Sequence, residues 1–153
     1  MTHIPIDMSD APKTGLRTQF AALCFRSRGG KPEVLLITSR GSGRWIVPKG
    51  WPMDGKTPME CAEIEAWEEA GVRGRIYPRS LGHYHYQKTA PDGSDLPCIA
   101  ILYALKVQDV ASSFPEAGQR KRKWLRPGKA ARLVREPELA QLIASFDPDL
   151  LKP

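Results

Sequence analysis

One short helix constrains the fold of this chain more than any other stretch. The sequence predicts that it begins at Pro58, because Thr57 suits the N-cap and Glu60 completes a capping box with it. Gly71 marks its end. At about 100° per residue, its small apolar residues fall on one stripe, which consists of Met59, Ala62, Ala66 and Ala70. A stripe this narrow allows the helix to lie close against a sheet, so we expect it to be the buried face.

A second arc of the helix carries three carboxylates, Glu65, Glu68 and Glu69. Their spacings of three and four residues make them neighbours on the helix surface. Each pair of like charges at such a spacing opposes the helix by roughly 0.2–0.5 kcal/mol, and near the C-terminal end the macrodipole also disfavours anions. A divalent cation that prefers oxygen ligands, magnesium or manganese, would turn this repulsion into coordination. The alternative is an acidic helix face in contact with solvent.

The loop before the helix favours the metal site. Between Pro48 and Gly55 it supplies a lysine and flexible glycine backbone directly ahead of the carboxylates. Loop and helix together resemble the Nudix box, in which a glycine, five residues, a glutamate and seven residues precede Arg-Glu, an apolar residue, any residue, Glu-Glu, any residue, Gly and an apolar residue. The residues that match in register are Gly50, Glu65, Ala66, Glu68, Glu69, Gly71 and Val72. Two positions depart, because Lys56 replaces the first glutamate and Ile64 replaces the arginine.

The similarity to Nudix hydrolases extends beyond the box, from about residue 17 to residue 146. The segments 21–26, 44–48 and 120–124 resemble the diphosphoinositol polyphosphate phosphohydrolase branch, which also contains enzymes acting on diadenosine polyphosphates. This resemblance implies an α/β (α+β) fold, the Nudix-type α/β/α sandwich with a mixed β-sheet between helices.

The same resemblance implies the chemistry of the site. Water would hydrolyse a phosphoanhydride with the help of magnesium, or manganese in its place, held by Glu65, Glu68 and Glu69 as metal ligands and catalytic residues. One of these carboxylates, or Glu116 from a later loop, would act as the base.

A substrate dense in phosphate gives the cations of the chain a role. The residues expected to bind it are Arg17, Arg40, Arg44, Lys49, Gly50, Trp51, Arg120 and Arg122. Trp51 would either stack on a base or pack against the loop. Lys56 and Ile64 leave two functions open, a slow enzyme or a non-catalytic sensor that binds a nucleotide or polyphosphate. Lys56, or a cation from the run 120–123, would then supply part of the missing positive charge.

Composition agrees with one compact domain. The chain has 153 residues, of which 41% are hydrophobic, so two domains would be cramped. We expect an irregular lead-in at 1–16, a single domain at 17–146 and a tail at 147–153. The formal net charge of +6 suits nucleic acid, an anionic membrane or a phosphorylated small molecule, or serves solubility alone. No pattern typical of nucleic-acid recognition accompanies the basic run 120–123, so we expect a phosphate-rich small molecule as the partner.

Location and thiol chemistry follow from what the sequence contains. Neither a signal peptide nor a run of about 18 apolar residues occurs, so we expect a cytoplasmic protein with no membrane contact. Cys24, Cys61 and Cys98 are odd in number and widely spaced, which favours reduced core thiols over a disulfide framework or a zinc site. His83 and His85 alternate with tyrosines, which is typical of a half-exposed strand. The oligomeric state is not fixed by these features.

Apolar runs and turn signals predict the remaining elements. The expected strands cover 18–25, 34–38, 45–47, 73–77, 80–88 and 98–107. The basic run that ends at Leu125 predicts a strand edge with its charges near a common site. Helices are expected at 127–134 and 136–146, and the second should cover the other face of the sheet.

Overall fold

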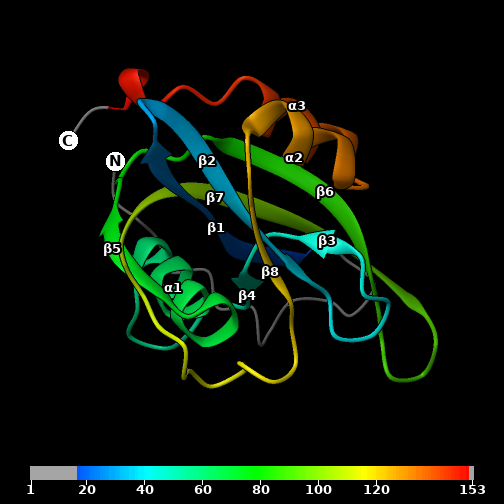
Figure 1. Ribbon diagram of the computed structural model, residues 1–153. Helices are drawn as coiled ribbons and strands as arrows, with labels where there is room; N and C mark the ends of the chain where they lie inside the picture. Colours follow the sequence, from blue (N-terminus) through cyan, green and yellow to red (C-terminus); the bar gives the residue numbers. More distant parts are fainter. Residues whose placement is uncertain (1–16, 152–153) are drawn as a thin grey trace.

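The computed structural model describes residues 17–151 and has a mixed sheet of eight strands at its centre (Figure 1). The strands are β1 (Arg17–Arg28), β2 (Lys31–Thr38), β3 (Trp45–Ile46), β4 (Lys49–Gly50), β5 (Val72–Ile76), β6 (Gly82–Thr89), β7 (Asp95–Val110) and β8 (Arg122–Leu125). Along the sheet the order is β3-β2-β1-β7-β5, while β4 pairs with β1, β6 with β7 and β8 with β2. The pair β1–β7 is parallel and the other strand pairs are antiparallel. The short strand β4 was not predicted.

Helices cover both faces of the sheet. Helix α1 (Pro58–Glu65) and the π-helical turn η2 (Ala66–Ala70) pack on one face, and α2 (Pro127–Leu133) and α3 (Pro137–Ala144) pack on the other (Figure 1). The predicted α/β/α sandwich is therefore confirmed. A short 3-10 turn, η3 (Pro148–Leu150), lies where we predicted only a tail. No helix within residues 17–151 combines the length and the apolar character needed to cross a membrane.

Strand β1 contributes to two cores, one on each face of the sheet. Leu23 and Phe25 belong to the core beneath α2 and α3, whereas Ala22 and Cys24 belong to the core beneath α1. Side chains alternate along a strand, so a continuous apolar run serves both faces.

The helix ends follow the prediction. Thr57 Oγ1 accepts a hydrogen bond from Glu60 N at 3.1 Å, and Glu60 Oε1 accepts one from Thr57 N at 2.9 Å, which completes the capping box. Gly71 ends η2 with a left-handed φ of 68°, a conformation that glycine adopts without strain.

The buried face of this helix differs from the prediction at one position. Cys61 is fully buried together with the predicted alanines, whereas Met59 only flanks the core. A thiol is small enough to face the sheet, while Met59 lies in the first turn, at the edge of the contact. Cys24, Cys61 and Cys98 are all free and buried, which confirms the prediction of core thiols.

Candidate active site

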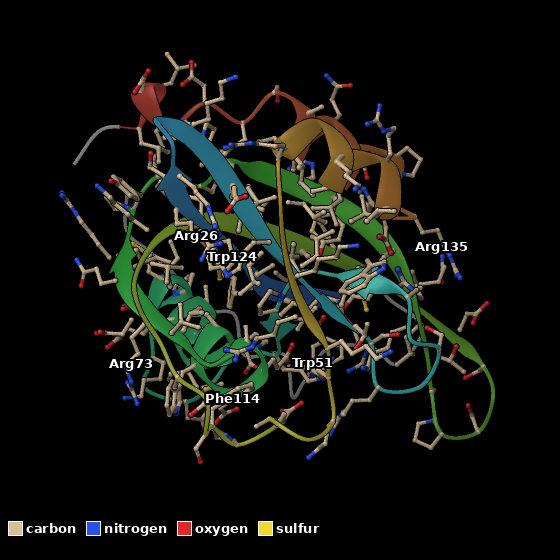
Figure 2. All side chains as sticks on the ribbon, in the orientation of Figure 1. Arg26, Trp51, Arg73, Phe114, Trp124 and Arg135 are labelled. Atoms are coloured by element: carbon tan, nitrogen blue, oxygen red, sulfur yellow. The ribbon has the colours of Figure 1, made fainter. Side chains whose placement is uncertain are left out.

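A pocket of about 720 Å³ lies at the end of the sheet that carries β3 and β4. Six of the eight predicted substrate-binding residues line it, namely Arg40, Arg44, Lys49, Gly50, Trp51 and Arg120. Its other charged residues are Glu65, Glu69, Lys88, Glu116 and Arg135. Trp51 and Arg135 lie on two sides of β3 (Figure 2). The pocket therefore joins a group of carboxylates to a larger group of cations.

Glu65 and Glu69 form a buried carboxylate pair. They are 8% and 6% exposed, and their side chains share a hydrogen bond. Burial, this hydrogen bond and the neighbouring carboxylates raise the pKa of Glu65. Burial also raises the pKa of Glu69, although Arg120 and Lys49 oppose that shift. The pair therefore holds a proton at a pH at which exposed glutamates are ionised.

Strand β4 fixes the pair from the backbone side. Lys49 N donates to Glu69 Oε1 at 3.3 Å. At Gly50, an added β-carbon would overlap the carboxyl group of Glu65. The first glycine of the box is therefore required because it lets a carboxyl group approach the backbone closely.

Glu68, the third predicted ligand, does not line the pocket. It lies in η2, where π-helical hydrogen bonds put more residues into each turn, so its direction differs from the one that α-helical spacing predicts. Within residues 17–151, no group of three or more histidine, cysteine, aspartate or glutamate side chains converges to hold a metal ion. The pair Glu65–Glu69 still fits magnesium, which binds through one or two carboxylates and completes its coordination with water and phosphate oxygens. A dication would displace the proton that joins the two carboxyl groups.

Arg120 lies beside the carboxylate pair and is not a rim cation. Its side chain is 7% exposed, its Nε donates to Glu116 Oε1 at 2.9 Å, and its Nη1 donates to the carbonyl oxygen of Thr38 at 3.0 Å. Its Nη2 lies 3.7 Å from Glu69 Oε1. A cation from the basic run thus lies beside a carboxylate of the box.

Arg44 and Lys49 line the pocket, and each lies against a buried side chain, Glu136 and Tyr86 respectively. Arg44 Nη1 lies 2.9 Å from Glu136 Oε2, and Glu136 is buried at the start of α3, outside the pocket lining. Burial lowers the pKa of Lys49 to about 8, an effect that the Glu69 charge opposes. The Nζ atom of Lys49 lies 4.9 Å from the centre of the Tyr86 ring. Arg44 is therefore paired with a buried carboxylate, and Lys49 lies over an aromatic ring, before any ligand binds.

Arg17 and Arg122 lie outside the pocket lining, unlike the prediction. Arg122 Nη1 donates to the carbonyl oxygens of Ala70 and Ala111 at 2.9 Å each, and its guanidinium lies over the ring of Phe114. Alternation along β8 turns this side chain toward the α1 face of the sheet, so it clamps the end of η2 and cannot reach the pocket.

Five functional candidates were missed by sequence reasoning: Gln19, Tyr86, Lys88, Arg135 and Glu136. Lys88 and Arg135 have no local pattern that separates them from ordinary surface cations. Glu136 carried a signal, because it occupies a helix N-cap, where serine, threonine, aspartate or asparagine is preferred, and it makes no capping hydrogen bond. An N-cap glutamate that does not cap its helix is available for another partner.

Known proteins resemble this chain over most of its length. The family model described as NUDIX domain matches residues 15–146. Nudix hydrolase 12, mitochondrial, of Arabidopsis thaliana is 33% identical over 119 residues, which cover 76% of this chain and 59% of that protein. Diphosphoinositol polyphosphate phosphohydrolase 3-beta of Bos taurus is 30% identical over 122 residues, which cover 78% of this chain and 70% of that protein. The chain spans between 59% and 63% of the length of three Arabidopsis relatives that it matches.

A solved structure has the same fold. The crystal structure of C. elegans Ap4A hydrolase superposes with a TM-score of 0.62 and 22% identity, covering 85% of this chain and 95% of that one. Identity at this level is evidence of the fold alone. The domain match, which spans far more than half of the sequence, agrees with the register of the box and with the sandwich around it. By these three criteria the chain belongs to the Nudix family.

Proposed function

We propose that this chain is a magnesium-dependent Nudix pyrophosphohydrolase that cleaves a phosphoanhydride bond in a polyphosphorylated substrate. Candidate substrates are diadenosine polyphosphates, diphosphoinositol polyphosphates and other nucleoside diphosphate derivatives. The observation that carries the proposal is the pocket in which the buried pair Glu65–Glu69 lies with Arg44, Lys49 and Arg120. The names of two similar proteins, a diphosphoinositol polyphosphate phosphohydrolase and an Ap4A hydrolase, support substrates of this kind.

Glu65 and Glu69 would hold the magnesium, or manganese in its place, with Glu68 as a further candidate ligand. When bound, the dication supplies charge that neutralises phosphoryl oxygens and favours attack by water. The carboxyl groups must first lose their shared proton, so metal affinity should rise with pH.

The cations of the pocket would bind the phosphates that do not react. Arg44 presents a planar fork to phosphate oxygens, and Lys49 presents a movable point charge. Arg120 is fixed by Glu116, so its charge stays beside the carboxylate pair and reduces the repulsion there. Trp51 packs against the core and also lines the pocket, which leaves part of its ring for a base.

Glu116 is a candidate for the base. Its backbone N–H donates to the carbonyl oxygen of Glu68 at 3.0 Å, and Arg120 holds its side chain at the pocket. This position near the pair allows the carboxylate to take a proton from the attacking water. Glu65 and Glu69 are the alternatives.

Purified protein incubated with diadenosine tetraphosphate, a diphosphoinositol polyphosphate and ATP tests the proposal. We expect product release with magnesium and none with EDTA. Glu69→Gln should lower kcat by at least about 10²-fold, because it removes a negative charge from the pair and disturbs its geometry. Glu63→Gln, on the same helix but outside the pocket lining, is the matched control. Absence of metal-dependent release from all three substrates would contradict the proposal.

A non-catalytic sensor is the second candidate, because Lys56 and Ile64 occupy two positions of the box. Saturable binding of a nucleotide or polyphosphate without turnover would favour it. Arg120 weighs against the sensor, because its positive charge beside Glu69 partly replaces the charge that an arginine at position 64 would supply.

Nucleic acid is a weaker candidate for the partner. The basic run does not form one surface patch, because Arg120 and Arg122 are directed inward to internal partners. Only Lys121 and Lys123 of this run are exposed. Two exposed lysines are a poor basis for the many phosphate contacts that support binding to nucleic acid.

A further inference from the structure

Two buried, uncharged polar side chains line the pocket, Gln19 from β1 and Tyr86 from β6. They are 3% and 8% exposed. Tyr86 pairs across the sheet with Cys98, and Cys98 pairs with Arg17, two residues before Gln19. Paired residues project from the same face of a sheet, so the two side chains lie in neighbouring rows of one face.

Each of the two side chains has a buried atom without a hydrogen-bond partner in the described part of the chain, Gln19 Oε1 and Tyr86 Oη. The Cys98 thiol interacts with the Tyr86 hydroxyl, but its own hydrogen bond goes to the carbonyl oxygen of Leu96 at 3.5 Å, and sulfur is a weak partner. Native proteins pair the great majority of buried polar atoms, because unpaired ones destabilise the fold. Two such atoms in the lining of one pocket are therefore positions that polar groups of a bound ligand can complete.

The chemistry of the two atoms defines that group. Burial raises the pKa of Tyr86, so its hydroxyl keeps its proton and can donate it. The structure places Gln19 Oε1 inward, and this atom accepts; ionised phosphate oxygens also accept, so phosphate does not pair with Gln19 in this orientation of its amide. A hydroxyl group donates and accepts, and therefore suits both partners. Lys49, whose Nζ lies 4.9 Å from the Tyr86 ring centre, brings a positive charge that suits phosphate next to Tyr86.

We infer that Gln19 and Tyr86 form a subsite for a free hydroxyl group of the substrate, such as the ribose of a nucleoside polyphosphate carries. The inference rests on the proposed function, since it assigns the part of the substrate that does not react. It also separates the candidate substrates. A nucleoside polyphosphate has free ribose hydroxyl groups, whereas every hydroxyl group of a fully phosphorylated cyclitol is esterified. The subsite therefore selects nucleoside polyphosphates.

The test compares ATP with inorganic tripolyphosphate, which shares the phosphate chain and lacks the nucleoside. Calorimetry on the full chain, with EDTA to prevent turnover, gives both dissociation constants. The wild type should bind ATP more tightly than tripolyphosphate. Tyr86→Phe should weaken ATP binding by about 5- to 10-fold, the effect of one lost hydrogen bond, and change tripolyphosphate binding by less than about twofold. Gln19→Leu should have the same selective effect from β1, on the other side of β7.

Thermal stability gives a second readout of opposite sign. Because the Tyr86 hydroxyl lacks a good partner in the free protein, Tyr86→Phe should raise Tm while it weakens ATP binding. Tyr77→Phe removes a hydroxyl from a separate cavity and should leave ATP binding unchanged.

Three results would overturn the subsite: equal losses for ATP and tripolyphosphate, ATP binding that survives both substitutions, or a wild type that binds ATP no more tightly than tripolyphosphate. Selective losses in the two variants, together with a wild type that turns over no substrate, would contradict the proposed hydrolase and leave the subsite standing.

Discussion

The backbone of Gly50 lies directly against the carboxyl group of Glu65, with no room for a β-carbon between them. Gly50 also pairs with Phe20 in the sheet, so the strand cannot move back to make room. The position of one carboxylate of the pair is therefore set by a residue that precedes the helix.

Gly50→Ala should displace the Glu65 carboxyl group and lower kcat by about 10²-fold, because small errors of position at a reacting centre are costly. The change in Tm should be small, since the new methyl group meets the end of a flexible side chain. Steady-state kinetics and a thermal melt measure the two effects. Gly128→Ala, where nothing lies within 4 Å of the added carbon, is the control. Equal kcat in both variants would contradict the assigned contact.

The carboxylate pair predicts how stability depends on pH in metal-free protein. The folded pair keeps its proton above the ordinary pKa of glutamate, whereas the unfolded chain releases it, so folding is favoured at low pH and this contribution is lost as the pH rises. The free energy of unfolding in EDTA should therefore fall from about pH 5 to about pH 8, and Glu65→Gln should flatten the fall. Denaturant titrations at several pH values measure it. Parallel slopes for wild type and variant would show that the pair is not protonated.

The effect of magnesium on Tm should be largest at the high end of the same pH range. Magnesium binds the ionised pair of the folded state, so at about pH 8 it should raise Tm by mass action, and less at about pH 5. Glu65→Gln should lose most of the increase. A magnesium effect that is equal at both pH values, or unchanged in Glu65→Gln, would place the metal elsewhere.

Glu136 should act as a positioning residue for Arg44. Glu136→Gln removes the charge behind the guanidinium, which should raise KM for diadenosine tetraphosphate by about fivefold and leave kcat within about twofold, since the affected contact is to phosphates that do not react. The double variant with Arg44→Ala should be no worse than Arg44→Ala alone. A lower KM in Glu136→Gln would mean that Glu136 competes with phosphate for the arginine and does not position it.

Arg120 should make the missing box arginine largely dispensable. Ile64→Arg adds a half-exposed ion pair of the kind that contributes roughly 0.2–1 kcal/mol, so it should raise kcat by only about twofold in the wild type. Arg120→Ala should lower kcat by about 10²-fold, and Ile64→Arg should recover more activity in that background than in the wild type. Equal gains in the two backgrounds would show that the two positions are independent.

Arg122 should contribute to stability and not to substrate binding. Arg122→Leu leaves the carbonyl oxygens of Ala70 and Ala111 without their donor, which should lower the free energy of unfolding by about 1–3 kcal/mol without changing KM. Lys123→Leu, the exposed neighbour on the same strand, is the control. A KM that rises in Arg122→Leu at unchanged stability would restore the rim role predicted from the sequence.

Much of the fold could be predicted because its signals are local. The capping box at Thr57, the left-handed turn at Gly71 and the two-sided apolar run of β1 are each decided by neighbouring residues. The carboxylate pair Glu65–Glu69 could be predicted for the same reason, since both members lie on one helix.

The rest of the pocket depends on distant contacts that local spacing does not encode. Glu68 departs from the expected arc because the helix ends in a π-turn. Arg120 and Arg122 are separated because only the second is in a strand that pairs with β2. Tyr86 lines the pocket from β6, and Glu136, at the start of α3, contacts Arg44; no pattern in their own segments could show either position.

The parallel pairing of β1 with β7 also sets an order of events during synthesis. It joins residues 17–25 to residues 98–106, and β8 must then reach back to β2. Pairings between such distant segments form late, because the entropy of closing the intervening chain must be overcome first. The box helix also precedes Arg120 in the sequence, so its carboxylates are synthesised before the cation that lies beside them in the folded protein. A nascent chain that has just reached Val72 carries every residue of the motif and still lacks Arg120 and the later strands that complete the pocket.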